Sequence, residues 1–249
     1  MFGKLKHIFD SAASMQKKNG RALVEMLNSI VPGAPNMQTK IDKALALVKA
    51  GADLTVTDNR GWNVMILLCK DPYDMTIDVL KEALARKPDL TRRCPIGQTA
   101  FDFAASIGFE YERTDKLDLL LQAGYDINTT DTEKSTALHG ATKMALVKYL
   151  LSHGADLNRQ DMDGNTPMMR FAKNGWTDFI AECVKYKHNP TLRNNNGHTA
   201  LDLALNLHPA CIELLQASAD HWDASNKNAV LAKDTATVKR VVFKGSGSL

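Results

Sequence analysis

The sequence lacks the long apolar runs of membrane-spanning proteins. Its longest runs, such as Val64 to Cys69, fall far short of the roughly 18 to 20 residues that a helix needs to cross a bilayer. Lys4, Lys6 and His7 stand near the N-terminus, but no continuous apolar stretch follows them, so we expect no secretory signal. We therefore expect a cytoplasmic protein with no transmembrane helix.

The sequence is equally poor in the signatures of metal sites and catalysis. Its four cysteines are scattered singly, without the paired C-x-x-C spacing of zinc or redox centres: Cys69, Cys94, Cys183 and Cys211. The histidines form no H-x-x-x-H pair, and there is neither a phosphate-binding loop nor a nucleophile elbow. We therefore predict buried reduced thiols, no metal, no cofactor and no enzymatic activity.

Basic residues are concentrated at the two ends of the chain. The net charge is +3, but residues 1–50 carry eight Lys and Arg against three Asp and Glu, and residues 226–249 carry five against one. The central block is consequently acidic. Neutralising nucleic-acid phosphates requires a continuous basic face, so this distribution argues against nucleic-acid binding.

What the sequence does contain is a repeat. One short segment, best seen as Gly154-Ala155-Asp156-Leu157-Asn158, recurs in variant form with starts at residues 51, 87, 124, 154, 188 and 218. The separations are 36, 37, 30, 34 and 30 residues. A second segment keeps the same phase, as Asn63-Val64-Met65-Ile66, Thr99-Ala100-Phe101-Asp102, Thr136-Ala137-Leu138-His139, Thr166-Pro167-Met168-Met169 and Thr199-Ala200-Leu201-Asp202.

These two markers make the sequence resemble the ankyrin-repeat proteins, whose unit runs through a turn, T-P-L-H, a short helix, a longer helix and G-A-D. The resemblance spans roughly residues 22–243. The sequence departs from the family motif in two ways. Lys87 and His188 replace the motif glycine, and only one repeat keeps the motif histidine, as His139. The resemblance implies an all-α fold, an ankyrin-repeat solenoid of stacked helix-turn-helix units with short hairpin loops.

The residues themselves support this fold. Threonine at the start of a short helix can accept hydrogen bonds from exposed backbone N–H groups, and proline suits the first helical position, as in Thr166-Pro167. Asp163-Gly164 and Asn196-Gly197 are turn signals between units. Leucines at helical spacing form apolar faces that one helix pair cannot bury alone, so neighbouring units must stack.

We expect five segments along the chain. They are an N-terminal amphipathic helix or cap (1–21), an N-terminal capping repeat (22–53), central repeats (54–220), a C-terminal capping repeat (221–243) and a flexible tail (244–249). The run from 228 to 242 is interpreted as a repeat without its motif.

Partner-binding residues are predicted at the hairpin tips. In proteins of the resembled family, partners usually meet the residues beside the turn glycine and the exposed side of the short helices. Here those positions hold Asn59, Arg60, Trp62, Ile96, Gln98, Met162, Asp163, Asn165, Asn195, Asn196 and His198. Trp62 beside Arg60 has the composition of a binding hot spot, although packing over the first repeat is an alternative role for it.

Four further features have predicted roles. We expect Trp176 to pack between two helices and His139 to hold its turn through backbone hydrogen bonds. The loop 109–113 either reaches a partner or fills space. Phe2, Leu5, Ile8, Phe9 and Ala12 line one helix face; covering the first repeat is the favoured role, and a membrane surface or a partner groove is the alternative.

The sequence therefore predicts a protein-binding module or adaptor, monomeric or partner-bound, using the hairpin tips and concave face. An alternative is a dedicated inhibitor of an enzyme, such as a bacterial immunity protein or a secreted effector acting in the host cytosol. Membrane association through residues 2–12 is a less favoured possibility.

Overall fold

The computed structural model describes residues 2–71, 75–108, 113–207 and 209–222, with the side chains of residues 2–9, 107, 206, 207 and 209 and of Gly108 left aside. The chain divides into two compact units, Met1–Thr132 and Glu133–Leu249, called here the N-terminal unit and the C-terminal unit. The predicted loop at 109–112, the run from 228 to 242 and the tail at 244–249 lie outside the described residues.

Helices are the regular secondary structure of the described residues, which contain no strand and only isolated bridges, such as the antiparallel one between Thr57 and Asn63. This confirms the predicted all-α class. The helices are α1 (Phe2–Asn28), α2 (Met37–Lys49), α3 (Val64–Cys69), α4 (Ile77–Ala85), α5 (Ala100–Gly108), α6 (Asp115–Gln122), α7 (Met144–Ser152), α8 (Pro167–Asn174), α9 (Thr177–Cys183), α10 (Ala200–Leu207) and the short 3-10 helix η1 (Pro209–Cys211). Residues 212–222, which follow η1, are helical as well.

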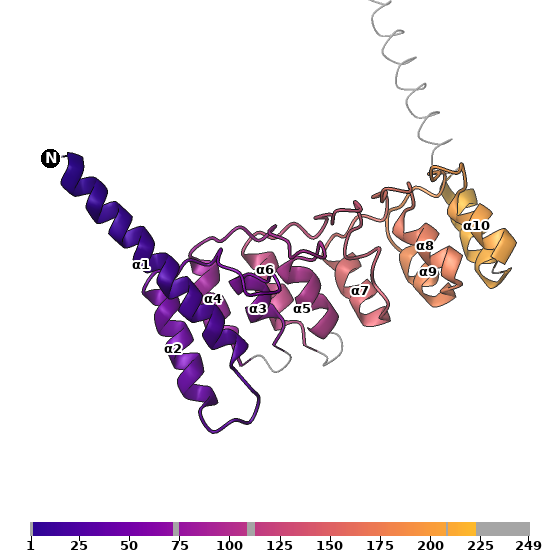
Figure 1. The fold of residues 1–249 in the computed structure, drawn as a ribbon. Helices are drawn as coiled ribbons and strands as arrows, with labels where there is room; N and C mark the ends of the chain where they lie inside the picture. Colours follow the sequence, from indigo (N-terminus) through magenta and orange to yellow (C-terminus); the bar gives the residue numbers. More distant parts are fainter. Residues whose placement is uncertain (1, 72–74, 109–112, 208, 223–249) are drawn as a thin grey trace, which may run out of the picture. The chain divides into compact units, whose positions relative to one another are not determined.

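The N-terminal unit contains two rows of helices (Figure 1). One row is α1, α3 and α5, and the other is α2, α4 and α6, with each helix contacting the next in its row. Every residue of α3 is buried, because this helix has neighbours on both sides and its partner α4 beneath it. Between the rows, Phe101 stacks on Tyr125 with ring centroids 4.5 Å apart.

The C-terminal unit repeats the arrangement. α8 contacts α10 in one row, and α7 contacts α9 in the other, with η1 continuing beyond α9. Phe171, fully buried in α8, contacts the rings of Trp176 and Phe179 at 5.9 and 5.3 Å. Trp176 thus packs at the junction of two helices, as predicted.

Local sequence explains where the short helices begin. Thr166 accepts a hydrogen bond from the backbone N–H of Met169 at 3.3 Å, and Pro167 occupies the first helical position, where no N–H is required. In α3, Asn63 replaces threonine and accepts from the N–H of Ile66 at 3.0 Å. The degraded motif at Asn63 therefore still caps its helix.

The segment with the best motif match departs from expectation. Thr136 to Gly140 forms a bridge and turns without becoming a helix, although Thr136-Ala137-Leu138-His139 is closest to the family motif. The next helix, α7, begins at Met144, eight residues after Thr136, whereas α9 begins at Thr177, eleven residues after Thr166. With Gly140 inside it, the segment lacks both the length and the helix propensity for a second turn.

α1 runs unbroken through residue 21, where the sequence predicted a boundary between a first helix and a capping repeat. Its last turns pack with α2. Close to that boundary, a Cβ atom on Gly20 would come within 2.5 Å of the carbonyl oxygen of Asp53. Glycine thus allows α1 and the first repeat to approach closely.

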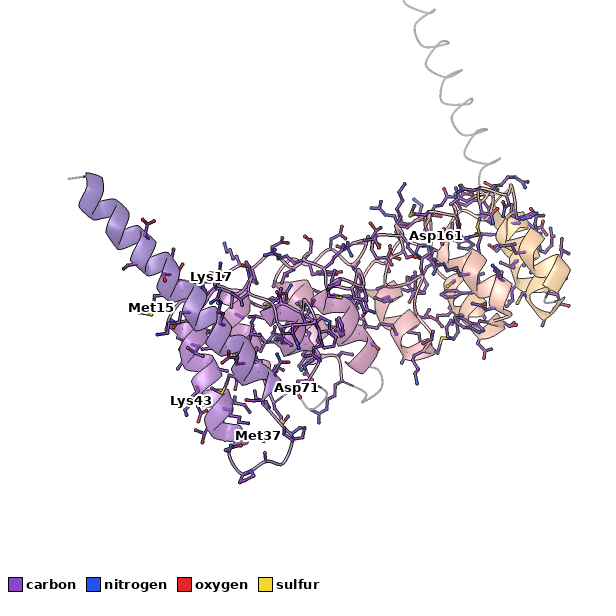
Figure 2. The ribbon with its side chains drawn as sticks, viewed as in Figure 1. Met15, Lys17, Met37, Lys43, Asp71 and Asp161 are labelled. Atoms are coloured by element: carbon purple, nitrogen blue, oxygen red, sulfur yellow. The ribbon has the colours of Figure 1, made fainter. Side chains whose placement is uncertain are left out.

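Two ion pairs in these units have a buried carboxylate, Asp71 and Asp161, both of which are labelled in Figure 2. In the N-terminal unit, the ammonium of Lys116 lies 3.7 Å from the Asp71 carboxylate, with both side chains nearly inaccessible. In the C-terminal unit, the guanidinium of Arg170 lies 2.8 Å from the carboxylate of Asp161.

No helix among the described residues is long and apolar enough to cross a membrane.

Candidate functional site: the hairpin tips

Four hairpin tips share one turn. In each, the first residue donates its N–H to the carbonyl of the fifth: Asp58 to Trp62 at 3.0 Å, Cys94 to Gln98 at 2.9 Å, Asp161 to Asn165 at 2.9 Å and Asn194 to His198 at 3.0 Å. The fourth residue is glycine, with φ between 75 and 81° at Gly61, Gly97, Gly164 and Gly197. The second and third residues are thereby left to point outward.

The first side chain of the turn reinforces it in three tips. Asp58 accepts the N–H groups of Arg60 and Trp62, both at 2.9 Å. Asp161 and Asn194 do the same for the third and fifth residues of their own tips. Burial alone would raise the pKa of Asp58, but the hydrogen bonds from Trp62 and Arg60 outweigh it and lower the pKa. Hydrogen bonds within each turn, from backbone N–H groups to its first side chain, thus hold these three tips in one conformation.

The fourth position of the remaining tip, 131–135, is not glycine. Lys134 occupies the place of the turn glycine and adopts a φ of 58°. Ser135, buried beside it, accepts a hydrogen bond from Arg170 at 2.8 Å.

Neighbouring tips in the C-terminal unit are joined by backbone hydrogen bonds. The N–H of Met162 donates to Glu133, and the N–H of Asn195 donates to Asp163, both at 2.9 Å. In the N-terminal unit the equivalent donor position is Pro95, which has no N–H. Pro95 packs instead, so closely that a Cβ on Gly61 would lie 2.6 Å from its ring. Tips 58–62 and 94–98 therefore form one adjoining surface.

Trp62 has cations above it and an aromatic ring beside it. The guanidinium of Arg60 lies 4.0 Å from the centre of the indole ring and the ammonium of Lys70 lies 5.4 Å from it. Phe103 contacts the same ring, centroid to centroid, at 5.0 Å. Asn28 accepts from Arg60 at 2.7 Å. Trp62 is half-buried, so it contributes packing and still presents part of its ring.

The predicted residues differ in how much they expose. Ile96 and Met162 are exposed apolar side chains, with 71% and 60% of their surfaces accessible. Asn59, Arg60, Asp163, Asn195, Asn196 and His198 are also exposed. Gln98 is half-buried. Asn165 is structural, because its carbonyl bonds to His139 at 3.0 Å and its side chain accepts from Asn194 at 2.9 Å.

His139 has the turn-holding role that was predicted. Its Nδ1 accepts the backbone N–H of Thr136 at 3.1 Å, and Nε2 meets the Asn165 carbonyl. Burial lowers the pKa of His139, which favours the neutral ring. Asp102 and Asp202 take the same place in their repeats, accepting from the N–H of Thr99 at 2.8 Å and of Thr199 at 2.9 Å. These three side chains make the same hydrogen bond at equivalent positions.

Sequence reasoning missed Lys70, Phe103 and Asn28. Asn28 and Phe103 belong to α1 and α5, and Lys70 follows the end of α3; none carries a motif signal, and only the fold brings them beside Trp62 and Arg60. Among the described residues, no group of three His, Cys, Asp or Glu is placed to hold a metal ion, and the four cysteines are free and buried. The tips therefore present apolar, aromatic, amide and basic side chains on turns that hydrogen bonds hold in place.

Comparison with known proteins fits this geometry. A family model described as ankyrin repeats (3 copies) matches residues 109–169 and 137–226. Ankyrin repeat domain-containing protein 37 of Homo sapiens is 33% identical over 130 residues, covering 47% of this chain and 82% of that protein. The crystal structure of the ankyrin repeat domain of Bcl-3, a member of the IkappaB protein family, superposes with a TM-score of 0.63 at 26% identity, covering 72% of this chain and 78% of that one.

Two further relatives match over a smaller part of their length. The B-cell lymphoma 3 protein homolog of Mus musculus is 27% identical over 168 residues, which is 66% of this chain and 37% of that protein. Palmitoyltransferase ZDHHC17 of Rattus norvegicus is 34% identical over 91 residues, 35% of this chain and 14% of the enzyme. The chain thus spans well under two thirds of several curated relatives.

Proposed function

Because this chain belongs to the ankyrin-repeat protein family, whose repeats are protein-interaction modules, we propose that it binds a protein partner through its hairpin tips and catalyses no reaction. The partner-facing residues are those predicted from the sequence, joined by Lys70 and Phe103. Asn165 serves mainly to hold its tip.

The exposure of Ile96 is the observation that carries this proposal. A side chain of this size, 71% exposed on a turn fixed by backbone hydrogen bonds, loses little conformational freedom when a partner covers it. Pro95 precedes it and stiffens the same tip. An apolar anchor on a rigid surface, with a tryptophan and an arginine adjoining it, is typical of a binding hot spot.

The compartment proposed is the cytosol. Four free cysteines are buried in the fold, two in each unit. Free thiols persist in reducing compartments, where disulfides are rare. The tips would accordingly meet a cytosolic partner.

The test begins by capturing partners on the intact protein and identifying them by mass spectrometry. Affinity is then measured for Ile96→Asp, which we expect to weaken binding by about 2 kcal/mol, roughly thirtyfold. Arg60→Ala should weaken it in the same direction. Trp62→Ala is a poorer probe, because losing the Phe103 contact would also destabilise the N-terminal unit.

The matched control is Val31→Asp. Val31 is also an exposed apolar residue of the N-terminal unit, 56% accessible, but it lies in the loop between α1 and α2. It should leave affinity unchanged, and both variants should melt like the parent. Equal affinities for the parent and Ile96→Asp would contradict binding through this tip.

A further inference from the structure

α1 packs on the repeats only along its second half. Its buried positions begin at Gly20 and continue through Leu23, Val24 and Leu27, whereas residues 10–18 are all exposed. The backbone N–H of Asp53 donates to the carbonyl of Gln16 at 2.9 Å, which marks where the helix leaves the first repeat. The preceding 14 residues project from the N-terminal unit (Figure 1), about 21 Å at 1.5 Å per residue.

The sequence of this projecting segment, residues 2–15, has the pattern of an amphipathic helix. Positions 2, 5, 8, 9 and 12 hold Phe, Leu, Ile, Phe and Ala, a spacing typical of one apolar helix face. Met15, 57% exposed, extends that side toward the repeat. Further along, the same side carries Leu23 and Leu27, which are buried because α2 covers them. Residues 10–18 of α1 are all exposed, so the shorter helix α2 does not cover Met15.

Lysines accompany the apolar face. Residues 2–18 contain four lysines and one acidic residue, Asp10. Lys17 and Lys18 are exposed at the foot of the projecting segment, and Lys49, at the end of α2, is exposed as well. Figure 2 shows Met15 and Lys17 on α1 and Lys43 farther along α2. An apolar helix face is thus combined with a local excess of positive charge.

We propose that residues 2–15 of α1 bind the surface of a membrane containing anionic phospholipids, lying in the interface without spanning it. The apolar face would occupy the boundary between headgroups and acyl chains, and the lysines would reach phosphates and carboxylates of the headgroups. The tip residues take no part in this contact, so lipid binding and protein binding are separate properties.

Charge favours lipid over a second copy of the chain. Antiparallel pairing of two projecting segments would bring Lys4 and Lys6 of one copy toward Lys17 and Lys18 of the other, with only Asp10 to offset them. Such like-charge contacts oppose association. An anionic headgroup layer instead meets each lysine with an opposite charge.

The experiment is flotation of the full chain with vesicles of phosphatidylcholine and phosphatidylserine in equal parts, beside vesicles of phosphatidylcholine alone. We expect recovery with the phosphatidylserine vesicles, decreasing with added salt. Met15→Glu, and separately the pair Lys17→Glu and Lys18→Glu, should each reduce the partition coefficient by roughly tenfold or more.

Matched controls are Val31→Glu for the apolar change and Lys43→Glu for the charge reversal. Both residues are exposed on the same unit, away from the projecting segment, and neither change should affect flotation by a comparable factor. Circular dichroism melting establishes that all variants are folded. The proposal is overturned if the parent does not float with phosphatidylserine vesicles, or if Met15→Glu floats as well as Val31→Glu. It also fails if the parent forms a dimer that Met15→Glu disrupts.

Discussion

The position three residues after the motif threonine holds aspartate in two repeats, Asp102 and Asp202, and other residues in the rest. Asp102 and Asp202 make the same hydrogen bond there in contrasting surroundings. Burial raises the pKa of Asp102, while the backbone N–H of Thr199 lowers the pKa of the more exposed Asp202. The ionised form is therefore disfavoured by folding at Asp102 and favoured at Asp202.

The pH dependence of two asparagine variants should show this contrast. A lowered pKa gives Asp202 a stabilising contribution that is present above its unfolded pKa and lost as pH falls, so Asp202→Asn should cost less stability in acid. A raised pKa makes ionised Asp102 unfavourable, so the cost of Asp102→Asn should shrink as pH rises past the folded pKa. Urea unfolding between acidic and neutral pH measures both, and parallel slopes would contradict the assignment.

Lys87 stands where the motif has glycine. After α4 it adopts a φ of 52°, a left-handed conformation that side chains disfavour. We expect Lys87→Gly to raise the free energy of unfolding by about 0.5 to 1 kcal/mol, because relief of this strain exceeds the added entropy of the unfolded chain. Lys81→Gly, within α4 itself, should lower it by about 1 kcal/mol. Chemical denaturation compares them, and a destabilised Lys87→Gly would refute the argument.

At the scale of elements, the tips differ in how their second residue uses its N–H. Met162 and Asn195 donate to the preceding tip, whereas Asn59 begins the series and donates to no described residue. We therefore predict that the amide of Asn59 exchanges with solvent at least about tenfold faster than those of Met162 and Asn195. Hydrogen exchange followed by NMR measures this, and equal rates would mean that the bonds between tips are not maintained.

Much of this level could be predicted from the sequence. The paired markers located the repeats, and the cap at Thr166, the turn at Asp163-Gly164 and the role of His139 followed from local hydrogen bonding. Local signals could not show that Thr136 to Gly140 stays a turn, since this depends on how soon the next helix, α7, begins. Nor could they place Lys70 and Phe103 beside Trp62, because those contacts join separate elements.

At the scale of the whole molecule, the four thiols report on folding. Cys69 and Cys94 lie in the N-terminal unit, and Cys183 and Cys211 in the C-terminal unit. Burial raises the pKa of Cys69 and Cys183 to about 12, so neither forms an appreciable thiolate at neutral pH. All four side chains are inaccessible to solvent or nearly so.

We accordingly expect the native protein to react negligibly with a thiol reagent at neutral pH and all four cysteines to react once it is unfolded. Along a denaturant series, mass spectrometry of labelled peptides should give one midpoint for Cys69 and Cys94 and one for Cys183 and Cys211, because each pair shares a core. Rapid labelling of native Cys69 would show that its unit opens readily.

The glycine within α1 that contacts the first repeat, Gly20, affects the direction of the helix. At Gly20, α1 passes close to the carbonyl oxygen of Asp53, and 18 residues of α1 precede this contact. At 1.5 Å per residue, these residues span about 27 Å. The substitution Gly20→Ala would tilt this part of α1, and a small change in angle at residue 20 would displace the start of the helix by several ångströms.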